Sequence, residues 1–296
     1  MGNSKQKIGF IGLGLMGQGF TKRLVECGYQ VTGYDLDPVK MAQAKLHGVI
    51  TAVNAAEVTA KSDVVLICVT STDGVEKAIF GEGGVAETAS SQMVLVDHST
   101  SIVSNTKAMA KKLKFETGMG WIDAPVSGGP EGAETGDLAI VAGGDDKDVA
   151  TVQAIMNDLS SVFTVFGPVG SGQVAKMVNQ ILVLNNYAVL AEALSLAEAG
   201  GIDASKIPDA LATGHAGSNM LKNVFPRMIE RDYAPKGYAR QLLKDLDMLH
   251  DLAKSLKTPT PISSQTASLL RILNSKGHEE LDGIAILKLY DQNDTV

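Results

Sequence analysis

A lysine and two side-chain amides lie close together in an otherwise apolar segment, residues 170–186 (GSGQVAKMVNQILVLNN). Apolar residues lie on nearly every side of the helix that this segment predicts, and such a helix is normally buried. Burial of an unpaired ammonium or amide costs free energy. Lys176, Asn179 and Gln180 nevertheless share one helical face, because they are three and four residues apart. The cost of burying such a polar patch therefore suggests that it has a functional role.

The lysine can serve as a general acid and base. In a partly dry cleft its ammonium can protonate a carbonyl oxygen and take the proton back in the reverse direction. Asn179 and Gln180 can then hold the oxygens of the substrate in line. The alternative is a structural lysine, whose stem packs on the helix while its ammonium reaches water.

A glycine-rich turn at the start of the chain indicates a second ligand. In GFIGLGLMG (9–17), Gly12, Gly14 and Gly17 follow a predicted strand and open a predicted helix. In a dinucleotide site the first glycine makes the turn, the second admits the pyrophosphate, and the third lets helix and strand pack closely. The alternative is a turn without a ligand. The predicted cofactor loop also contains the residues between these glycines: Leu13, Leu15 and Met16.

The next predicted strand ends at Asp35. A carboxylate at this place can accept hydrogen bonds from the ribose hydroxyls and repels a 2′-phosphate. Leu36 follows it, where an arginine could have held that phosphate. The sequence therefore predicts NAD as the cofactor rather than NADP, unless Asp35 is only a solvated acid in a turn.

A second glycine turn, Ser127, Gly128 and Gly129, follows another predicted strand. Ligands of open α/β sheets bind beyond the carboxyl ends of the strands. One hydroxyl and several unobstructed backbone amides make a suitable site for a carboxylate. A plain turn is the alternative.

The elements that must position these residues fall into two groups. Up to about residue 168, strand patterns alternate with short helical patterns, which predicts an α/β domain with a doubly wound, Rossmann-type parallel sheet. Beyond it only helical patterns follow, so we expect domains at 1–168 and 169–296, the second all-helical and opened by a long interdomain helix. The predicted strands lie within 7–12, 28–35, 52–53, 62–69, 83–100, 120–129, 136–144 and 160–170. The predicted helices are 15–27, 40–46, a short one before the strand within 83–100, 104–114, 171–199, 203–212, 216–230, 238–256, 262–275 and 281–291.

Composition narrows the classes of protein. The 296 residues are 45% apolar and 20% charged, with a net charge of −7, which argues against nucleic-acid or anionic-membrane partners. Cys27 and Cys68 lack metal-ligand or redox spacing, and no His/Cys/Asp cluster predicts a metal. We expect a cytoplasmic protein, because no signal sequence is evident and polar residues interrupt the longest apolar stretch.

Four motifs in order resemble those of the β-hydroxyacid dehydrogenases: GFIGLGLMG, DAPVSGG-x-x-GA-x-x-GDL, GSGQ-x-x-K-x-x-NQ and LLKDLDM. The resemblance extends from Ile8 to Tyr290. It implies an NAD-dependent oxidoreductase that transfers hydride between nicotinamide and a small β-hydroxyacid or semialdehyde. It assigns the proton transfer to Lys176 and the substrate carboxylate to Ser127–Gly129.

The resemblance also implies further contacts. Lys244, in LLKDL, matches a lysine beside both nicotinamide and substrate, and Val69, Thr70 and Thr100 match the nicotinamide side of the cofactor site. Two prolines common in the family are missing: one position falls in Thr70–Thr72 and the other is Val103.

The pair Asn179–Gln180, where many members have two asparagines, resembles the branch that reduces tartronate semialdehyde to glycerate. Dehydrogenases of 3-hydroxyisobutyrate, threonate or other short β-hydroxyacids are the alternatives. A histidine-dependent 2-hydroxyacid dehydrogenase is disfavoured, because none of the five histidines has a matching acid-paired motif. A non-catalytic dinucleotide sensor would not need Lys176. The apolar helical half predicts a homodimer or homotetramer.

Overall fold

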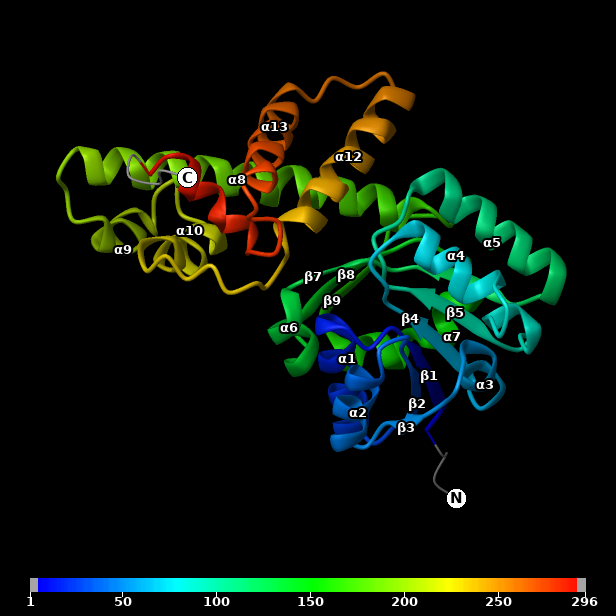
Figure 1. Cartoon of the computed structure of the whole chain (residues 1–296). Helices are drawn as coiled ribbons and strands as arrows, with labels where there is room; N and C mark the ends of the chain where they lie inside the picture. Colours follow the sequence, from blue (N-terminus) through cyan, green and yellow to red (C-terminus); the bar gives the residue numbers. More distant parts are fainter. Residues whose placement is uncertain (1–4, 292–296) are drawn as a thin grey trace. The chain divides into compact units, whose positions relative to one another are not determined.

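The computed structural model describes residues 5–291 and divides the chain into two compact units between Lys176 and Met177. The first unit is built on a parallel sheet and the second is helical (Figure 1). The predicted fold class is confirmed. The contacts divide the chain inside a helix, later than the boundary expected at 168/169, because the first turn of that helix is hydrogen-bonded to the sheet unit.

The main sheet of the first unit has six strands, all parallel, in the order β3-β2-β1-β4-β5-β6. The order reverses beside β1, and such a reversal is where doubly wound sheets bind ligands. The strands are β1 (Lys7–Ile11), β2 (Gln30–Tyr34), β3 (Ile50–Thr51), β4 (Val64–Ile67), β5 (Val94–Asp97) and β6 (Gly120–Asp123).

Successive side chains of the central strands point to opposite faces, and each face is covered by its own helices (Figure 1). Val64 and Leu66 of β4 belong to the core shared with α1, α6 and α7, whereas Val65 and Ile67 belong to the core shared with α3, α4 and α5. The helical elements are α1 (Leu15–Glu26), α2 (Pro38–Leu46), α3 (Ala55–Ala60), α4 (Thr72–Phe80), η1 (Val85–Glu87), α5 (Val103–Thr117), α6 (Gly129–Thr135) and α7 (Asp146–Leu159).

A smaller sheet joins the carboxyl end of β6. It consists of β7 (Val126–Ser127), β8 (Leu138–Ala142) and β9 (Ser160–Val165), with β8 antiparallel to β7 and parallel to β9. A bridge between Asp123 and Gly143 connects the two sheets. The second glycine turn therefore follows β7 and is held beside the end of β6.

The second unit consists of helices packed around a core that includes Leu184, Leu194, Phe225, Leu246 and Leu270. Its helical elements begin with the long α8, whose first residues belong to the sheet unit. They are α8 (Ser171–Ala199), η2 (Ala204–Lys206), α9 (Ile207–Leu211), α10 (Asn219–Asn223), α11 (Phe225–Ile229), α12 (Ala239–Ser255), α13 (Pro261–Ser275) and η3 (Gly283–Leu289).

Several predicted elements were wrong in detail. The short strand predicted at 52–53 lies at 50–51, the helix predicted over 216–230 is two short helices, and the last one is a 3₁₀ helix. Helices α3, α4 and α7 were not predicted from the sequence, and only a loop was expected where α6 forms. The start of α4 has a sequence signal that was overlooked, since the Ser71 hydroxyl accepts the Gly74 amide as an N-cap.

Helix α8 is less buried than its apolar sequence predicted. Val178 and Leu182 are 54% and 63% exposed, while Met177 and Leu184 are buried. Among the described helices α8 is long and apolar enough to cross a membrane, contrary to the expectation from its polar interruptions. Length and composition are weak support for a span, because core helices meet the same criterion. Asn185 contacts Ser263 and Thr266 of α13, as expected for a helix packed within a protein core.

Candidate active site

The first glycine turn has the close approaches that its spacing predicted. Gly12 has a φ of +95°, and a Cβ there would collide with the carbonyl oxygen of Cys68. A Cβ on Gly17 would collide with the carbonyl oxygen of Gly12, so only glycine lets α1 start this close to β1. Within the described residues, nothing lies within 4 Å of the place where a Cβ on Gly14 would stand. The turn therefore leaves room for a ligand at Gly14.

Asp35 is more than a solvated turn acid. Its side chain is 12% exposed, and its carboxylate oxygens accept the backbone amides of Leu13, at 2.7 Å, and Asp37, at 2.8 Å. Asp35 thus ties the end of β2 to the glycine turn. The Lys40 ammonium lies 3.9 Å from a carboxylate oxygen of each aspartate.

A pocket of about 710 Å³ opens at this edge of the sheet. Its lining includes five predicted cofactor residues: Gly12, Gly14, Asp35, Val69 and Thr70. Leu13 is fully buried, with its side chain in the core and its amide bonded to Asp35, so it shapes the turn without lining the pocket. Leu15, Met16, Gly17, Thr100 and Lys244 are also outside the lining.

The pocket fits a dinucleotide. The open backbone at Gly14 precedes the N-terminus of α1, where amide groups and the helix dipole favour phosphates. Asp35 lies at the ribose end and the loop with Val69 and Thr70 lines another part. These residues would hold the nucleotide.

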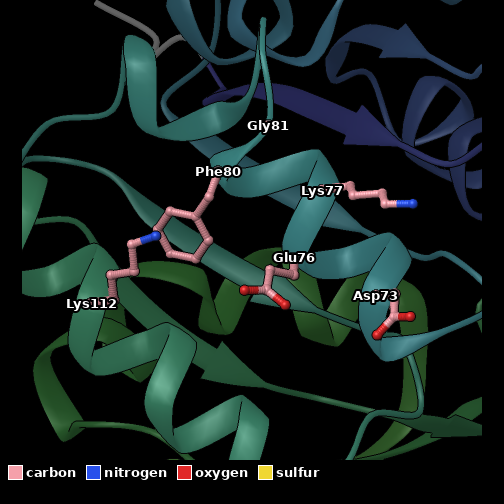
Figure 2. Close-up of a pocket in the computed structure, with 6 residues that line it drawn as sticks. All are labelled: Asp73, Glu76, Lys77, Phe80, Gly81 and Lys112. Carbon is pink, nitrogen blue, oxygen red and sulfur yellow. The ribbon is translucent and has the colours of Figure 1, made fainter.

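A second, smaller hollow of about 400 Å³ lies on α4 and α5. Figure 2 shows Asp73, Glu76 and Lys77 around it, with the Lys112 ammonium over the Phe80 ring at 4.0 Å. The Lys77 side chain points away from that ring (Figure 2) and also lines the larger pocket. None of the predicted site residues lines the smaller hollow, so we place the cofactor in the larger one.

Lys176 lies beside the second glycine turn. Its side chain is nearly buried, and its ammonium donates a hydrogen bond of 2.8 Å to the carbonyl oxygen of Val126. Ser127 follows directly, and then come Gly128 and Gly129 with φ values of +132° and +66°. The sheet unit therefore brings together the predicted proton donor and the predicted carboxylate site.

The first turn of α8 is fixed by a buried acid that the sequence analysis missed. Asp123, at the end of β6, accepts the amides of Gly170 at 2.6 Å and Gln173 at 2.8 Å. Burial raises the pKa of Asp123 to about 6, although the hydrogen bonds from these amides act in the opposite direction. Asp123 is the first residue of the DAPVSGG motif, but the amides that it accepts lie about 50 residues later in the chain, so the motif did not indicate this role.

In the helical unit, Asn179 and Gln180 belong to a polar network. The Asn179 amide donates to the Gln180 oxygen at 2.9 Å, and the Gln180 amide donates to Asp245 at 2.6 Å. Asp245 also pairs with Lys244 at 3.2 Å. The structure thus links three predicted substrate residues through Asp245, which the sequence analysis missed although it stands next to Lys244 in LLKDL.

His98 has a packing role, as its lack of an acid partner predicted. It is 3% exposed, stacks on Phe20 at 4.8 Å and donates from Nδ1 to the carbonyl oxygen of Ala124 at 2.7 Å. Burial lowers its pKa to about 4, which keeps the ring neutral near pH 7.

Comparison with known proteins agrees with this geometry. Residues 7–167 match the family model for the NAD-binding domain of 6-phosphogluconate dehydrogenase, and residues 170–290 match the one described as NAD-binding of NADP-dependent 3-hydroxyisobutyrate dehydrogenase. An uncharacterized oxidoreductase of Synechocystis is 35% identical over 96% of this chain and 98% of its own length. The 2-hydroxy-3-oxopropionate reductase of Escherichia coli is 34% identical over 95% of this chain and 96% of its own.

The fold agrees as well. The crystal structure of 3-hydroxyisobutyrate dehydrogenase from Salmonella typhimurium superposes with a TM-score of 0.87 at 26% identity, covering 96% of this chain and all of that one. The chain belongs to the 3-hydroxyisobutyrate dehydrogenase-like family of β-hydroxyacid dehydrogenases. It is an NAD(P)-dependent oxidoreductase with an N-terminal NAD-binding domain.

Proposed function

We propose that this enzyme interconverts tartronate semialdehyde and glycerate with NAD(H). The observation that carries the proposal is the Lys176 ammonium, bonded to Val126 directly before the Ser127–Gly129 turn. This arrangement offers a proton donor and a carboxylate site within one unit. The choice of substrate is supported by the Asn179–Gln180 pair and by similarity to 2-hydroxy-3-oxopropionate reductase.

In the proposed reduction each group has one task. The Ser127 hydroxyl and the amides of Gly128 and Gly129 bind the substrate carboxylate. When held in the pocket at Gly14 and Asp35, NADH would supply the hydride for the carbonyl carbon. The Lys176 ammonium gives its proton to the carbonyl oxygen as the C–H bond forms, and it recovers a proton from solvent before the next turnover.

The helical network supplies orientation. Both ends of the Gln180 carboxamide are occupied, by Asn179 and Asp245, and the Gln180 side chain is almost buried. We therefore propose that Gln180 orients Asn179, and that Asn179 meets the hydroxyl of the substrate. Helical spacing places Asn179 on the same face of α8 as Lys176, one turn later.

The charges around Asp35 support NAD over NADP. Asp35 and Asp37 both line the pocket, and the Lys40 ammonium is shared between them at 3.9 Å. A 2′-phosphate would have to enter beside two carboxylates, where the Lys40 ammonium is already engaged. A ribose hydroxyl can instead donate to a remaining lone pair of Asp35.

A substrate panel tests the proposal. The purified protein is assayed with the semialdehydes of tartronate, methylmalonate and succinate and with sulfolactaldehyde, each with NADH and with NADPH. We expect the highest kcat/KM with tartronate semialdehyde and NADH. A higher value with another semialdehyde would reassign the substrate and leave the family unchanged, whereas no reduction of any would contradict the proposed role.

A further inference from the structure

Gln173 is a fully buried polar residue one helical turn before Lys176. Its carboxamide nitrogen donates to the carbonyl oxygen of Ser99 at 2.8 Å, and its carboxamide oxygen accepts the amide of Ser101 at 3.0 Å. Its own backbone amide is held by Asp123. One side chain therefore fastens the loop after β5 to the first turn of α8.

The same loop is fastened to the cofactor pocket. The Ser99 hydroxyl accepts the amide of Val69 at 2.9 Å, and the Thr72 hydroxyl accepts the amide of Ile102 at 3.0 Å. Val69 and Thr70 line the pocket. Hydrogen bonds thus connect the pocket wall through Ser99 and Gln173 to the first turn of α8, one turn before Lys176.

We propose that Gln173 is a positioning residue, which sets the Lys176 turn at a fixed distance from the pocket wall at Val69 and Thr70. The proposal rests on the proposed function of Lys176, because a fixed distance matters only if proton and hydride reach the same carbonyl group. Placement errors of about 1 Å can lower a rate by roughly 10²-fold.

The alternative is that Gln173 only fills space. A side chain of the same length without polar ends would then serve equally well. The two hydrogen bonds speak against this, because replacement by methionine leaves the Ser99 carbonyl and the Ser101 amide buried without a partner. Both groups lie in the loop after β5, so the lost hydrogen bonds are those that hold this loop to the first turn of α8.

The first test measures the connection without any substrate. Hydrogen–deuterium exchange is compared between the wild-type protein, Gln173→Met and a control, Ile155→Val, which removes a methyl group from the buried face of α7 in the same unit. We expect exchange in residues 97–103 to rise by about tenfold or more in Gln173→Met alone, because local opening follows local hydrogen bonding. Equal exchange in that segment for both variants would overturn the proposal.

The second test measures catalysis per functional site. Binding sites are counted by NADH titration, and the single-turnover rate with the preferred semialdehyde of the panel is divided by that count. Gln173→Met is expected to lower this rate by roughly 10- to 100-fold with NADH affinity nearly unchanged. A purely structural role would reduce the number of sites and leave the rate per site at the wild-type value, and that result would overturn the proposal.

The Lys176→Ala variant separates this inference from the proposed function. If Lys176→Ala keeps wild-type turnover, the proposed function fails, whatever Gln173→Met does. If Lys176→Ala loses turnover, the double variant is informative. Adding Gln173→Met to Lys176→Ala should then lower the rate by less than Gln173→Met lowers it in the wild-type protein, because both changes act on one proton transfer. Fully additive losses would refute positioning through Lys176.

Discussion

The two units place their polar groups in different ways. Around the cofactor pocket, the sheet unit uses backbone: the glycine turn, the Leu13 amide on Asp35 and the Gln173 carboxamide on the Ser99–Ser101 loop. In the helical unit, side chains hold side chains, from Asn179 through Gln180 to Asp245. The chemistry available at each unit follows from this contrast.

A site built on backbone accepts few changes and suits a ligand that stays the same, such as a dinucleotide. A site built on paired side chains can be altered by one substitution, because its hydrogen bonds are made by side chains and not by the backbone. We infer that the sheet unit sets cofactor and proton transfer, while the helical unit sets substrate choice.

The largest expected effect is on Lys176. Lys176→Ala is expected to lower kcat by about 10²–10⁴-fold, the usual contribution of a general acid, with NADH affinity retained. Stopped-flow turnover and NADH fluorescence titration measure the two quantities. Lys111→Ala, an exposed lysine on α5, is the matched control and should leave both at the wild-type level.

Near-normal turnover of Lys176→Ala would show that the lysine is structural. Loss of turnover together with loss of NADH binding would contradict the expectation that Lys176→Ala retains its affinity for NADH. Only lost turnover with retained binding agrees with the division between the two kinds of site.

The sequence predicted the parts of the site that depend on glycine and on helical spacing. Gly12 and Gly17 were identifiable because only glycine tolerates those close approaches, and Lys176 stood out as a cation in an apolar helix. Asp123, Gln173 and Asp245 were missed because their partners are distant in the chain, and the spacing of a motif does not show such contacts.

The fold shows the same limit. Alternating strands and helices predicted the α/β class, and α8 was predicted with its observed bounds. The short helices α3 and α6 were missed because their sequences carry little apolar periodicity, and tertiary contacts decide their conformation. The exposure of Val178 and Leu182 could not be predicted either, because an apolar sequence does not show which side of a helix is covered.

The next prediction concerns pH and two buried groups of the sheet unit. The pKa of His98 is lowered from 6.5 to about 4 by burial, so the unfolded chain binds the proton more readily. The stability that neutral His98 contributes is therefore lost as pH falls from about 6.5 to 4. Compared with His98→Gln, the wild-type protein should therefore gain roughly 3 kcal/mol in free energy of unfolding as pH rises from 4 to 6.5.

Asp123 should show the opposite slope. Its pKa is raised from 3.8 to about 6 by burial, so the folded protein binds the proton more readily and stability is lost as pH rises through this window. Compared with Asp123→Asn, the wild-type protein should lose roughly 3 kcal/mol between pH 4 and 6. Urea unfolding at four pH values measures both differences in free energy of unfolding. If the two differences changed with pH in the same direction, the burial of one of the two groups would be contradicted.

A smaller effect is expected at the ribose end of the pocket. Asp35→Asn keeps an oxygen that can accept the Leu13 amide but removes the charge that repels a 2′-phosphate. The ratio of kcat/KM for NADPH to that for NADH should rise by about tenfold, or about 1.4 kcal/mol. Asp37→Asn should raise the ratio less, because Asp37 also lines the pocket but is more exposed. A wild-type preference for NADPH would contradict the assignment of Asp35.

The smallest expected effect on catalysis accompanies a change in assembly. An apolar stripe follows one side of α8, with exposures of 54–75% in Val178, Leu182, Val189 and Leu196. These residues are four or seven apart, so they lie along one side of the helix, with Asn185 and Asn186 between Leu182 and Val189. Such a row is costly to leave in water and is typical of surfaces that contact another protein chain. We propose that it meets a second copy of this chain.

The wild-type protein should therefore be a dimer or tetramer at micromolar concentration, as measured by light scattering after gel filtration. Leu182→Glu places a charge in the middle of the stripe and should shift the protein toward the monomer, because an unpaired charge is expensive to bury. Leu256→Glu is the matched control, since Leu256 is 60% exposed and lies outside the stripe, at the end of α12. A monomeric wild-type protein would contradict the proposal, as would equal dissociation of both variants.

If the helical unit combines assembly and substrate choice while the sheet unit holds the cofactor, NADH affinity per chain should change by less than about threefold on dissociation, which is below 0.7 kcal/mol.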